Sequence, residues 1–380
     1  MQAARAVIYL DNFRRNIESV RRKIGPHTGI CVPVKADAYG HGALPIAKTA
    51  LEAGAASLAV ASAFEGAELR QAGINAPIFL FSQISPAETK NIAALNLIPF
   101  VGDRETLEIL AAAVPSGSNL LEVHLKVDTG MGRLGCRPEE AAGLALVIAK
   151  LKNLKLGGIA THLAVSDSLI AEDLAYTKKQ LSLFREAADS VREAGIDPGL
   201  LHAANSGALC FHEDAYFDMV RPGIFLYGYS PAQGLPDGLV SEPVMELRTI
   251  VAFIKKVRRG EYISYGRTWK APEDTFIGTL PIGYADGLPR LLSNNHSVSI
   301  RGRAYPLAGR ICMDQCMADL GTSGEVQRWD EAVIFGPGFE DAASIARKTG
   351  TISYEILCNI NKRVQRVYQA LPNLADRACL

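Results

Sequence analysis

The first 230 residues alternate between two kinds of segment, and this alternation limits the fold more than any other feature. Short apolar runs with the length of buried strands occur at 30–34, 57–61, 77–82, 97–101, 121–127, 156–162, 200–204 and 217–227. Helix-like stretches lie between them, at 43–53, 64–72, 86–94, 103–113, 138–150 and 173–194. Such alternation is typical of a parallel sheet. It predicts an α/β fold with an N-terminal (β/α)8 barrel of TIM type, with a doubly wound open sheet as the alternative.

A further helix is expected ahead of the first strand, because Phe13, Ile17, Val20 and Ile24 recur at helical spacing after Asp11, which can cap it. The alternation ends at residues 230–243, where proline and glycine are frequent, as in a linker.

Beyond the linker the chain is rich in strand-like segments, at 245–257, 261–265, 275–280, 298–300 and 332–335. Helices are expected near 341–349 and 353–361. We therefore predict a barrel domain over 1–235 and a mainly β domain over 236–380, with residues 1–10 packing on the second domain.

Charge and composition limit the partners. Lys+Arg and Asp+Glu both number 40, and this balance argues against a nucleic-acid partner and favours a small molecule. The N-terminus lacks the pattern of a signal peptide, and no apolar run of about 18 residues predicts a membrane span. Seven scattered cysteines without a CxxC pair indicate reduced thiols in a cytoplasmic protein, with no metal site.

Polar residues follow several predicted strands, at the end of a barrel where active sites lie. Lys35 follows the first strand, and a lysine there can lose its proton and form a Schiff base. Arg133 stands among three glycines, and its guanidinium suits a carboxylate. His162 ends the sixth run. Each residue also has an ordinary explanation: a snorkelling lysine, a plain glycine loop and a structural histidine.

Small residues after the last two strands, at 205–207 and 220–224, suit a phosphate held by backbone N–H groups. In the second half, Tyr265 stands between Ser264 and Gly266 and, taken alone, is best explained as an exposed turn residue.

Taken in order, these segments resemble the bacterial alanine racemases, pyridoxal-phosphate (PLP) enzymes with a barrel followed by a β domain. The segment VKADAYGHG at 34–42 resembles the PLP-lysine signature of that family. The other matching motifs are KVDTGMGRLG (126–135), THL (161–163), NSGA (205–208), VRPGIFLYG (220–228), SYGRTW (264–269), IGYADG (282–287), GRICMDQ (309–315) and SYEILC (353–358). The match is collinear from Val7 to Tyr368, nearly the whole chain.

The resemblance implies a racemase with two bases. Lys35 is similar to the lysine that binds PLP and acts as one base, and Tyr265 to the base on the opposite face of the substrate. Arg221 resembles the partner of the pyridine nitrogen, which a permanently charged arginine keeps unprotonated. His162 is similar to the residue that links Tyr265 to Arg221.

The resemblance also implies binding residues. Arg133 and Met313 would hold the substrate, and Lys126 matches a position that some family members carry as a carbamate. The residues implied for the cofactor, besides Lys35 and Arg221, are Tyr39, Asn205, Ser206, Gly223, Ile224 and Tyr354. The implied entrance corridor comprises Asp167, Tyr284, Arg290, Arg310 and Ile352. Because Tyr265 and Met313 come from the partner subunit in that family, a homodimer with shared sites is expected.

The expected reaction interconverts L- and D-alanine, to supply D-alanine for cell-wall peptidoglycan or to catabolise it. The alternatives are a racemase of broader specificity for serine or lysine, a PLP barrel decarboxylase and a non-catalytic PLP carrier. A decarboxylase would have an acidic partner for the pyridine nitrogen, so Arg221 argues against it. A PLP carrier can consist of the barrel alone, so the second domain argues against a carrier.

Overall fold

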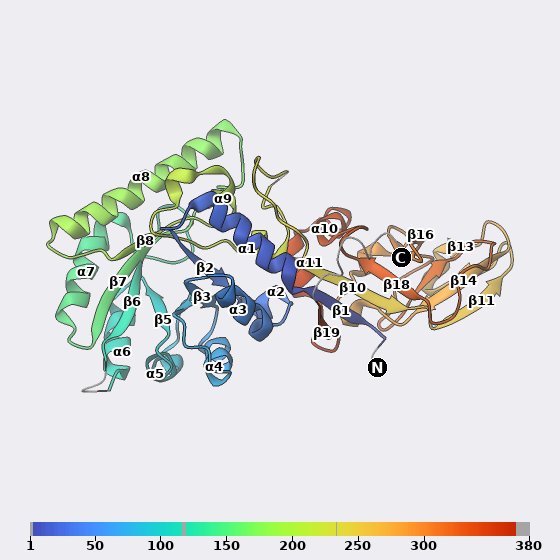
Figure 1. Ribbon diagram of the computed structural model, residues 1–380, viewed down its shortest axis with the longest axis horizontal. Helices are drawn as coiled ribbons and strands as arrows, with labels where there is room; N and C mark the ends of the chain where they lie inside the picture. Colours follow the sequence, from blue (N-terminus) through green and yellow to red (C-terminus); the bar gives the residue numbers. More distant parts are fainter. Residues whose placement is uncertain (1–2, 116–118, 233, 370–380) are drawn as a thin grey trace.

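The molecule has two lobes arranged along its longest axis (Figure 1), and the computed structural model describes residues 3–115, 119–232 and 234–369. The helix-covered lobe contains the first half of the chain, and the strand-rich lobe contains most of the second half (Figure 1).

The first lobe is built on eight parallel strands joined in the order β8-β7-β6-β5-β4-β3-β2-β9. They are β2 (Gly29–Pro33), β3 (Ser57–Val60), β4 (Ile78–Leu80), β5 (Ile98–Val101), β6 (Leu121–Lys126), β7 (Leu154–Ala160), β8 (Leu200–His202) and β9 (Met219–Val220). Backbone hydrogen bonds from Asp218 N to Leu201 O (3.0 Å) and from Arg221 N to Ala204 O (2.8 Å) join the two ends of the sheet. The sheet is closed, so the predicted barrel is confirmed over an open sheet.

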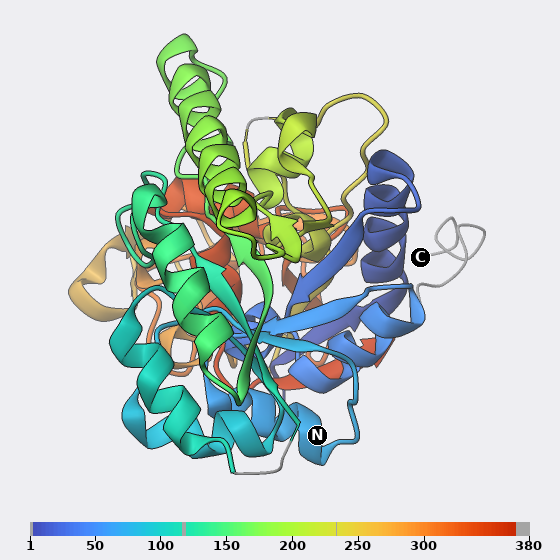
Figure 2. The ribbon, with the colours of Figure 1, turned by 90° about the vertical axis from the view of Figure 1, so that its left-hand side faces the viewer.

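Helices surround these strands, as Figure 2 shows from the barrel end of the molecule. They are α1 (Leu10–Ile24), α2 (Lys35–Tyr39), α3 (Ala43–Glu52), α4 (Ala63–Gln71), α5 (Thr89–Ala94), α6 (Arg104–Ala113), α7 (Ala141–Lys150), α8 (Ala171–Glu193) and α9 (Ser206–Phe211). The prediction that Asp11 caps the first helix is wrong: α1 begins at Leu10, and Asp11 accepts a hydrogen bond from Arg14 (2.9 Å) in its first turn.

The second lobe is mainly β, as predicted, with a six-stranded sheet in the order β16-β15-β18-β10-β1-β19. Its strands are β1 (Arg5–Tyr9), β10 (Met245–Ile250), β15 (Ser297–Ile300), β16 (Arg303–Pro306), β18 (Glu331–Phe335) and β19 (Gln365–Gln369). The smaller sheets contain β11 (Phe253–Val257), β14 (Thr275–Leu280) and β17 (Cys316–Asp319), and β12 (Tyr262–Ile263) with β13 (Trp269–Lys270). The helices are α10 (Ala342–Thr349) and α11 (Ser353–Cys358).

Strand β1 belongs to this second sheet, where it pairs antiparallel with β10 and parallel with β19. The single apolar run expected over 245–257 divides into β10 and β11, which lie in different sheets. The sequence prediction missed β13, β16, β17 and β19, which are short or carry several polar residues.

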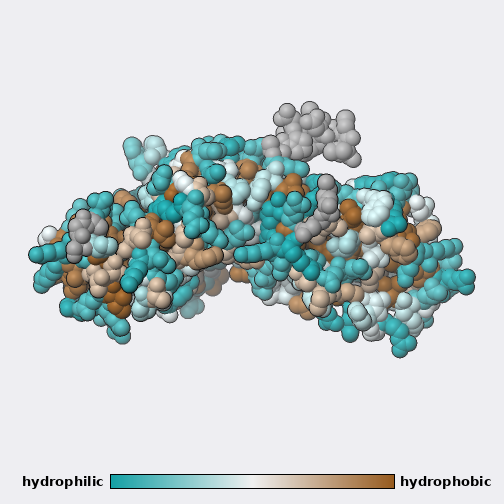
Figure 3. Space-filling view, turned by 90° about the horizontal axis from the view of Figure 1, so that it is seen from below, coloured by the Kyte–Doolittle hydropathy of each residue, from teal (hydrophilic) through white to brown (hydrophobic). Residues whose placement is uncertain are grey.

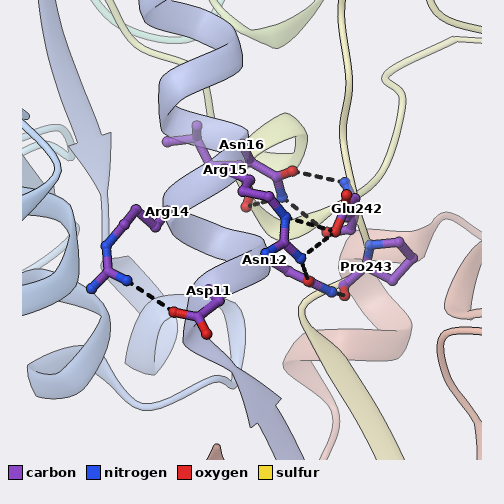
Figure 4. A network of polar contacts seen from close by, with 8 residues as sticks. Asp11, Asn12, Arg14, Arg15, Asn16, Glu242 and Pro243 are labelled. Atoms are coloured by element: carbon purple, nitrogen blue, oxygen red, sulfur yellow. Dashed lines mark hydrogen bonds and ion pairs between the residues drawn. The ribbon is translucent and has the colours of Figure 1, made fainter. Parts of the chain in front are cut away.

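Helix α1 holds the segment that joins the lobes (Figure 4). The buried amide of Asn16 donates to Leu226 O and Glu242 O (both 2.9 Å) and accepts from Glu242 N (2.7 Å). Asn12 donates to Pro243 O (2.7 Å). These bonds fix where the chain leaves the barrel, although the domain boundary at residue 235 stays a prediction.

Within the described ranges, no helix is long and apolar enough to cross a membrane. The six cysteines that those ranges contain are free thiols, and Cys379 lies outside them. Figure 3 shows apolar residues scattered among polar ones on one face of both lobes.

Candidate active site

A cavity of about 300 Å³ opens where the barrel strands end. It collects most of the barrel residues singled out from the sequence, namely Lys35, Tyr39, Arg133, His162, Asp167, Asn205, Ser206, Arg221 and Gly223. Tyr354, from α11 in the second half of the chain, also lines it. The residues come together because the carboxyl ends of parallel strands meet at one end of a barrel.

Lys35 lies at the start of an unusual turn. The four residues that follow it, 36–39, have φ of 53°, in the left-handed region that residues with a side chain seldom adopt. Backbone and side-chain bonds hold this turn: Ala36 N donates to Glu65 (2.7 Å), and Ala43 N donates to Asp37 (2.7 Å). A strained backbone held by its surroundings is frequent at functional sites.

Gly40 ends this turn and explains how α11 reaches the cavity. A Cβ at Gly40, which has φ of 81°, would lie 2.3 Å from Leu357 O. Only glycine therefore allows α11 to pack here, and this packing brings the Tyr354 ring to 6.0 Å from the Tyr39 ring.

The charge state of Lys35 suits covalent chemistry. Burial, and then the nearby Arg133 guanidinium, lowers the pKa of its amine below the ordinary value of 10.5. A lowered pKa increases the fraction of neutral amine, which is the nucleophilic form.

Arg221 is buried beneath the same cavity, directly after β9. Its guanidinium donates to His202 Nδ1 (2.8 Å), Thr161 O (2.7 Å) and Ala203 O (3.0 Å). Burial lowers its pKa to about 10, so the group stays cationic at neutral pH.

Ser206 and Gly223 form a small polar cradle at the cavity wall. Ser206 Oγ accepts a hydrogen bond from Gly223 N (2.8 Å), and a Cβ at Gly223 would lie 2.8 Å from Tyr39 Oη. Asn205 caps α9 by accepting from Ala208 N (3.0 Å). Ile224 is fully buried, and its side chain belongs to the hydrophobic core. Backbone N–H groups and hydroxyls in such an arrangement suit a phosphate.

The glycine-containing loop after β6 carries Arg133. Asp128 Oδ1 accepts from the backbone N–H groups of Gly130, Met131 and Gly132 at 2.9, 2.9 and 3.0 Å, which fixes the loop. Lys126 is buried below the loop, and burial, followed by the charges of Arg221 and Arg133, lowers its pKa well below 10.5.

His162 lines the cavity, and burial, then the charge of Lys126, lowers its pKa well below 6.5, so its ring is neutral at pH 7. Between described residues, none of the hydrogen bonds joins this imidazole to Arg221. The link implied by the resemblance therefore stays a prediction.

The other predicted site residues lie elsewhere in this chain. Tyr265 and Met313 have exposed fractions of 70% and 53% and do not line the cavity. The strands that flank Tyr265, β12 and β13, belong to the second lobe, and β13 lies away from the barrel in Figure 1. The remaining entrance residues, also outside the cavity wall, are Tyr284, Arg290, Arg310 and Ile352. One chain thus contains the cavity without its predicted second base.

The sequence prediction missed His202, the imidazole partner of Arg221, and Phe81, which lines the cavity. A histidine at the end of a buried apolar run was the available signal for His202. It also missed Tyr227, whose hydroxyl donates to Pro33 O (2.7 Å) just before Lys35.

A lysine amine with a lowered pKa suits a carbonyl group, and the Ser206–Gly223 cradle suits a phosphate. A barrel enzyme that uses PLP is therefore the class that this site defines. Two family models match the chain: "Alanine racemase, N-terminal domain" over residues 8–231 and "Alanine racemase, C-terminal domain" over residues 244–368. The chain belongs to the alanine racemase family. It is a PLP-dependent amino-acid racemase, and thus an isomerase.

Individual relatives agree over the full length. An alanine racemase of Treponema denticola is 47% identical, covering 97% of this chain and 98% of its own. The crystal structure of an alanine racemase from Clostridium difficile 630 has a TM-score of 0.93 at 37% identity, with 97% and 96% of the two chains covered. An alanine racemase from Bacillus anthracis with bound L-Ala-P has a TM-score of 0.89 at 35% identity, with 98% and 96% covered.

Proposed function

We propose that this chain interconverts L- and D-alanine with Lys35 as one base and the partner subunit's Tyr265 as the other. The proposal rests mainly on one observation: the cavity holds a lysine amine with a lowered pKa, whereas Tyr265 of the same chain is exposed outside it. Racemisation needs proton transfer on both faces of Cα, and a second subunit can supply the missing group.

PLP, when bound, supplies the electron sink that makes the Cα proton acidic. Lys35 would hold the cofactor and would move a proton at its Nζ. Ser206, Gly223 and Ile224 hold the phosphate together with Tyr39 and Tyr354, and Asn205 keeps Ser206 in place by capping α9. Arg221, cationic and buried, would be the partner of the pyridine nitrogen and would keep it unprotonated.

Substrate orientation falls to Arg133 and the partner's Met313, with the guanidinium binding the carboxylate. The lowered pKa of Lys126 favours the neutral amine, the form that reacts with CO₂ to give a carbamate. Such a carbamate would place a negative charge between the guanidinium groups of Arg133 and Arg221. Asp167, Tyr284, Arg290, Arg310 and Ile352 form the substrate entrance.

Because the enantiomers have equal free energy, the same enzyme can supply D-alanine for peptidoglycan or consume it. The cytoplasmic location stays a prediction. A broader specificity for serine or lysine is the second candidate that the resemblance leaves open.

The first test is chiral quantification of alanine after mixing the purified, PLP-loaded protein with L-alanine. We expect equal amounts of both enantiomers and no loss of total alanine. Serine and lysine in parallel reactions measure the specificity. Unchanged L-alanine would refute the proposed substrate, and unchanged substrates throughout would support a PLP carrier.

The shared site can be tested by mixing two inactive variants, Lys35→Ala and Tyr265→Phe, after dissociation and reassociation. A mixed dimer with shared sites contains one intact site, so statistical pairing restores about a quarter of the wild-type activity. Sites confined to one chain would restore none. Tyr262→Phe, at another exposed tyrosine near Tyr265, is the matched control and should keep full activity.

A further inference from the structure

A file of polar side chains runs through the barrel interior from Arg221 to the opposite end. Arg221 Nη1 lies 2.8 Å from His202 Nδ1, and His202 Nε2 lies 2.8 Å from His124 Nδ1. His124 Nε2 lies 3.4 Å from Glu122 Oε1, and Lys155 Nζ lies 2.8 Å from Glu122 Oε2. Glu122 is near the start of β6, at the N-terminal end of the barrel, whereas Arg221 lies beneath the cavity.

The groups at the two ends of this file, Arg221 and Glu122, determine which ring nitrogen of each histidine carries the proton. A guanidinium only donates, so His202 Nδ1 must accept, and the neutral ring carries its proton on Nε2. That proton is donated to His124 Nδ1, so His124 carries its own proton on Nε2. Within the described ranges His124 Nε2 has no hydrogen-bond partner of normal geometry, and the Glu122 carboxylate, an acceptor only, is the group that faces it.

The charge states agree with this arrangement. Burial lowers the pKa of both His124 and His202, so both rings are neutral at pH 7. The adjacent His124 imidazole and the ammonium of Lys155 lower the pKa of Glu122 to about 2, so its carboxylate is ionised. Glu122 and Lys155 also line a hollow of about 760 Å³ at the N-terminal end of the barrel, which leaves this end of the file open to water.

The neighbouring strand leaves room for these side chains. Strand β7 has two consecutive glycines beside β6, at Gly157 and Gly158. A Cβ at Gly157 would lie 2.4 Å from Glu122 Cγ, and a Cβ at Gly158 would lie 2.4 Å from His124 Cε1. Barrel interiors are normally filled by branched apolar residues, so the two glycines show that this space is reserved for polar groups.

We propose that Glu122 is a positioning residue: through His124 it fixes His202 as a hydrogen-bond acceptor, and so holds the Arg221 guanidinium in place beneath the cofactor. The proposal rests on the proposed role of Arg221 beside the PLP ring. Without the carboxylate, either ring can reverse its tautomer, and a reversed His202 would present an N–H to the N–H of Arg221. The guanidinium would then lose its imidazole partner and its fixed orientation.

The test compares the wild type with Glu122→Gln, because a glutamine amide can either donate to His124 or accept from it. Imidazole ¹⁵N shifts of the histidine-labelled, PLP-free protein distinguish the protonated ring nitrogen from the nitrogen with the lone pair. Signals are assigned with single histidine variants. We expect an unprotonated Nδ1 on His202 and His124 in the wild type, and a mixture of tautomers in Glu122→Gln. With PLP and alanine, kcat should fall about 10-fold while KM changes less than about 2-fold.

Two controls keep the test decisive. Lys155→Gln removes the surface ion pair but leaves the carboxylate, so it should keep the wild-type tautomers. Glu139→Gln removes a carboxylate from a remote exposed ion pair and should change neither tautomers nor kcat.

Wild-type tautomers in Glu122→Gln, a proton on Nδ1 of His202 in the wild type, or mixed tautomers with unchanged kcat would each overturn the positioning role. Mixed tautomers in Lys155→Gln would assign the effect to the ion pair and would also overturn the positioning role of Glu122. The proposed function fails separately, if the wild type does not racemise alanine whatever the ¹⁵N shifts show.

Discussion

Because several histidines are buried, unfolding below pH 6.5 should be accompanied by a measurable uptake of protons. Burial lowers the pKa of His41 to about 4, and the pKa values of His162 and His202 lie well below 6.5 in the folded chain. The His41 ring is therefore neutral in the folded chain at pH 5.5, and burial favours the neutral form of the other two rings as well. In the unfolded chain, a histidine with pKa of about 6.5 is about 90% protonated at that pH.

Unfolding at pH 5.5 should therefore take up about 0.9 proton at His41, and protonation of His162 and His202 adds to this uptake. The unfolded state binds more protons, so stability rises with pH below 6.5 and is lost as the pH falls. The neutral His41 ring alone lowers the free energy of unfolding at pH 5.5 by between about 1 and 2 kcal/mol.

Proton uptake can be measured directly, by titrating the folded and urea-unfolded PLP-free protein to the same pH. His41→Gln should reduce the uptake at pH 5.5 by about 0.9 proton. His27→Gln, at an exposed histidine, is the matched control. An uptake below about 0.5 proton, or equal effects of the two variants, would show that the buried His41 ring is not neutral and would refute the argument.

Three other predictions concern the linker and the cradle. Asn16→Ala removes three buried hydrogen bonds and should lower the free energy of unfolding by about 3 kcal/mol in urea denaturation, whereas Arg15→Gln, at a half-exposed ion pair, should cost less than about 1 kcal/mol. Gly228→Ala places a Cβ 2.2 Å from Pro243 Cα at φ of 102° and should lower the free energy of unfolding by about 3 kcal/mol or more. Gly234→Ala, where a Cβ would meet open space, should lower it by only about 1–2 kcal/mol. Ser206→Ala should weaken PLP retention about 10-fold in equilibrium dialysis, because the phosphate would lose the Ser206 hydroxyl as a donor.

Much of the barrel could be predicted because its strands and helices follow from patterns of neighbouring residues. A buried parallel strand needs a short continuous apolar run, and the run before Lys35 became β2 within one residue at each end. The second lobe was harder. Strand β1 pairs with β10 and β19, which lie more than 230 residues away in the chain, and no local pattern shows such a pairing.

The residues of the site also differ in whether the sequence could single them out. Lys35 could be singled out because it follows an apolar run directly, and Arg133 because it stands among three glycines. Their motifs resemble one family, and the family models agree with that resemblance. His124 and Glu122, in contrast, look like ordinary members of a strand, because their interest comes from contacts with β7 and β8.

The sequence by itself determined the alternation of strands and helices in the barrel, the residues at the barrel mouth and the family, because these depend on residue type and spacing along the chain. Only the tertiary structure decided three further features: the left-handed turn after Lys35, the entry of Tyr354 into the cavity and the polar file from Arg221 to Glu122. Each depends on contacts between segments far apart in the chain, such as Gly40 with Leu357 O and Gly158 with His124.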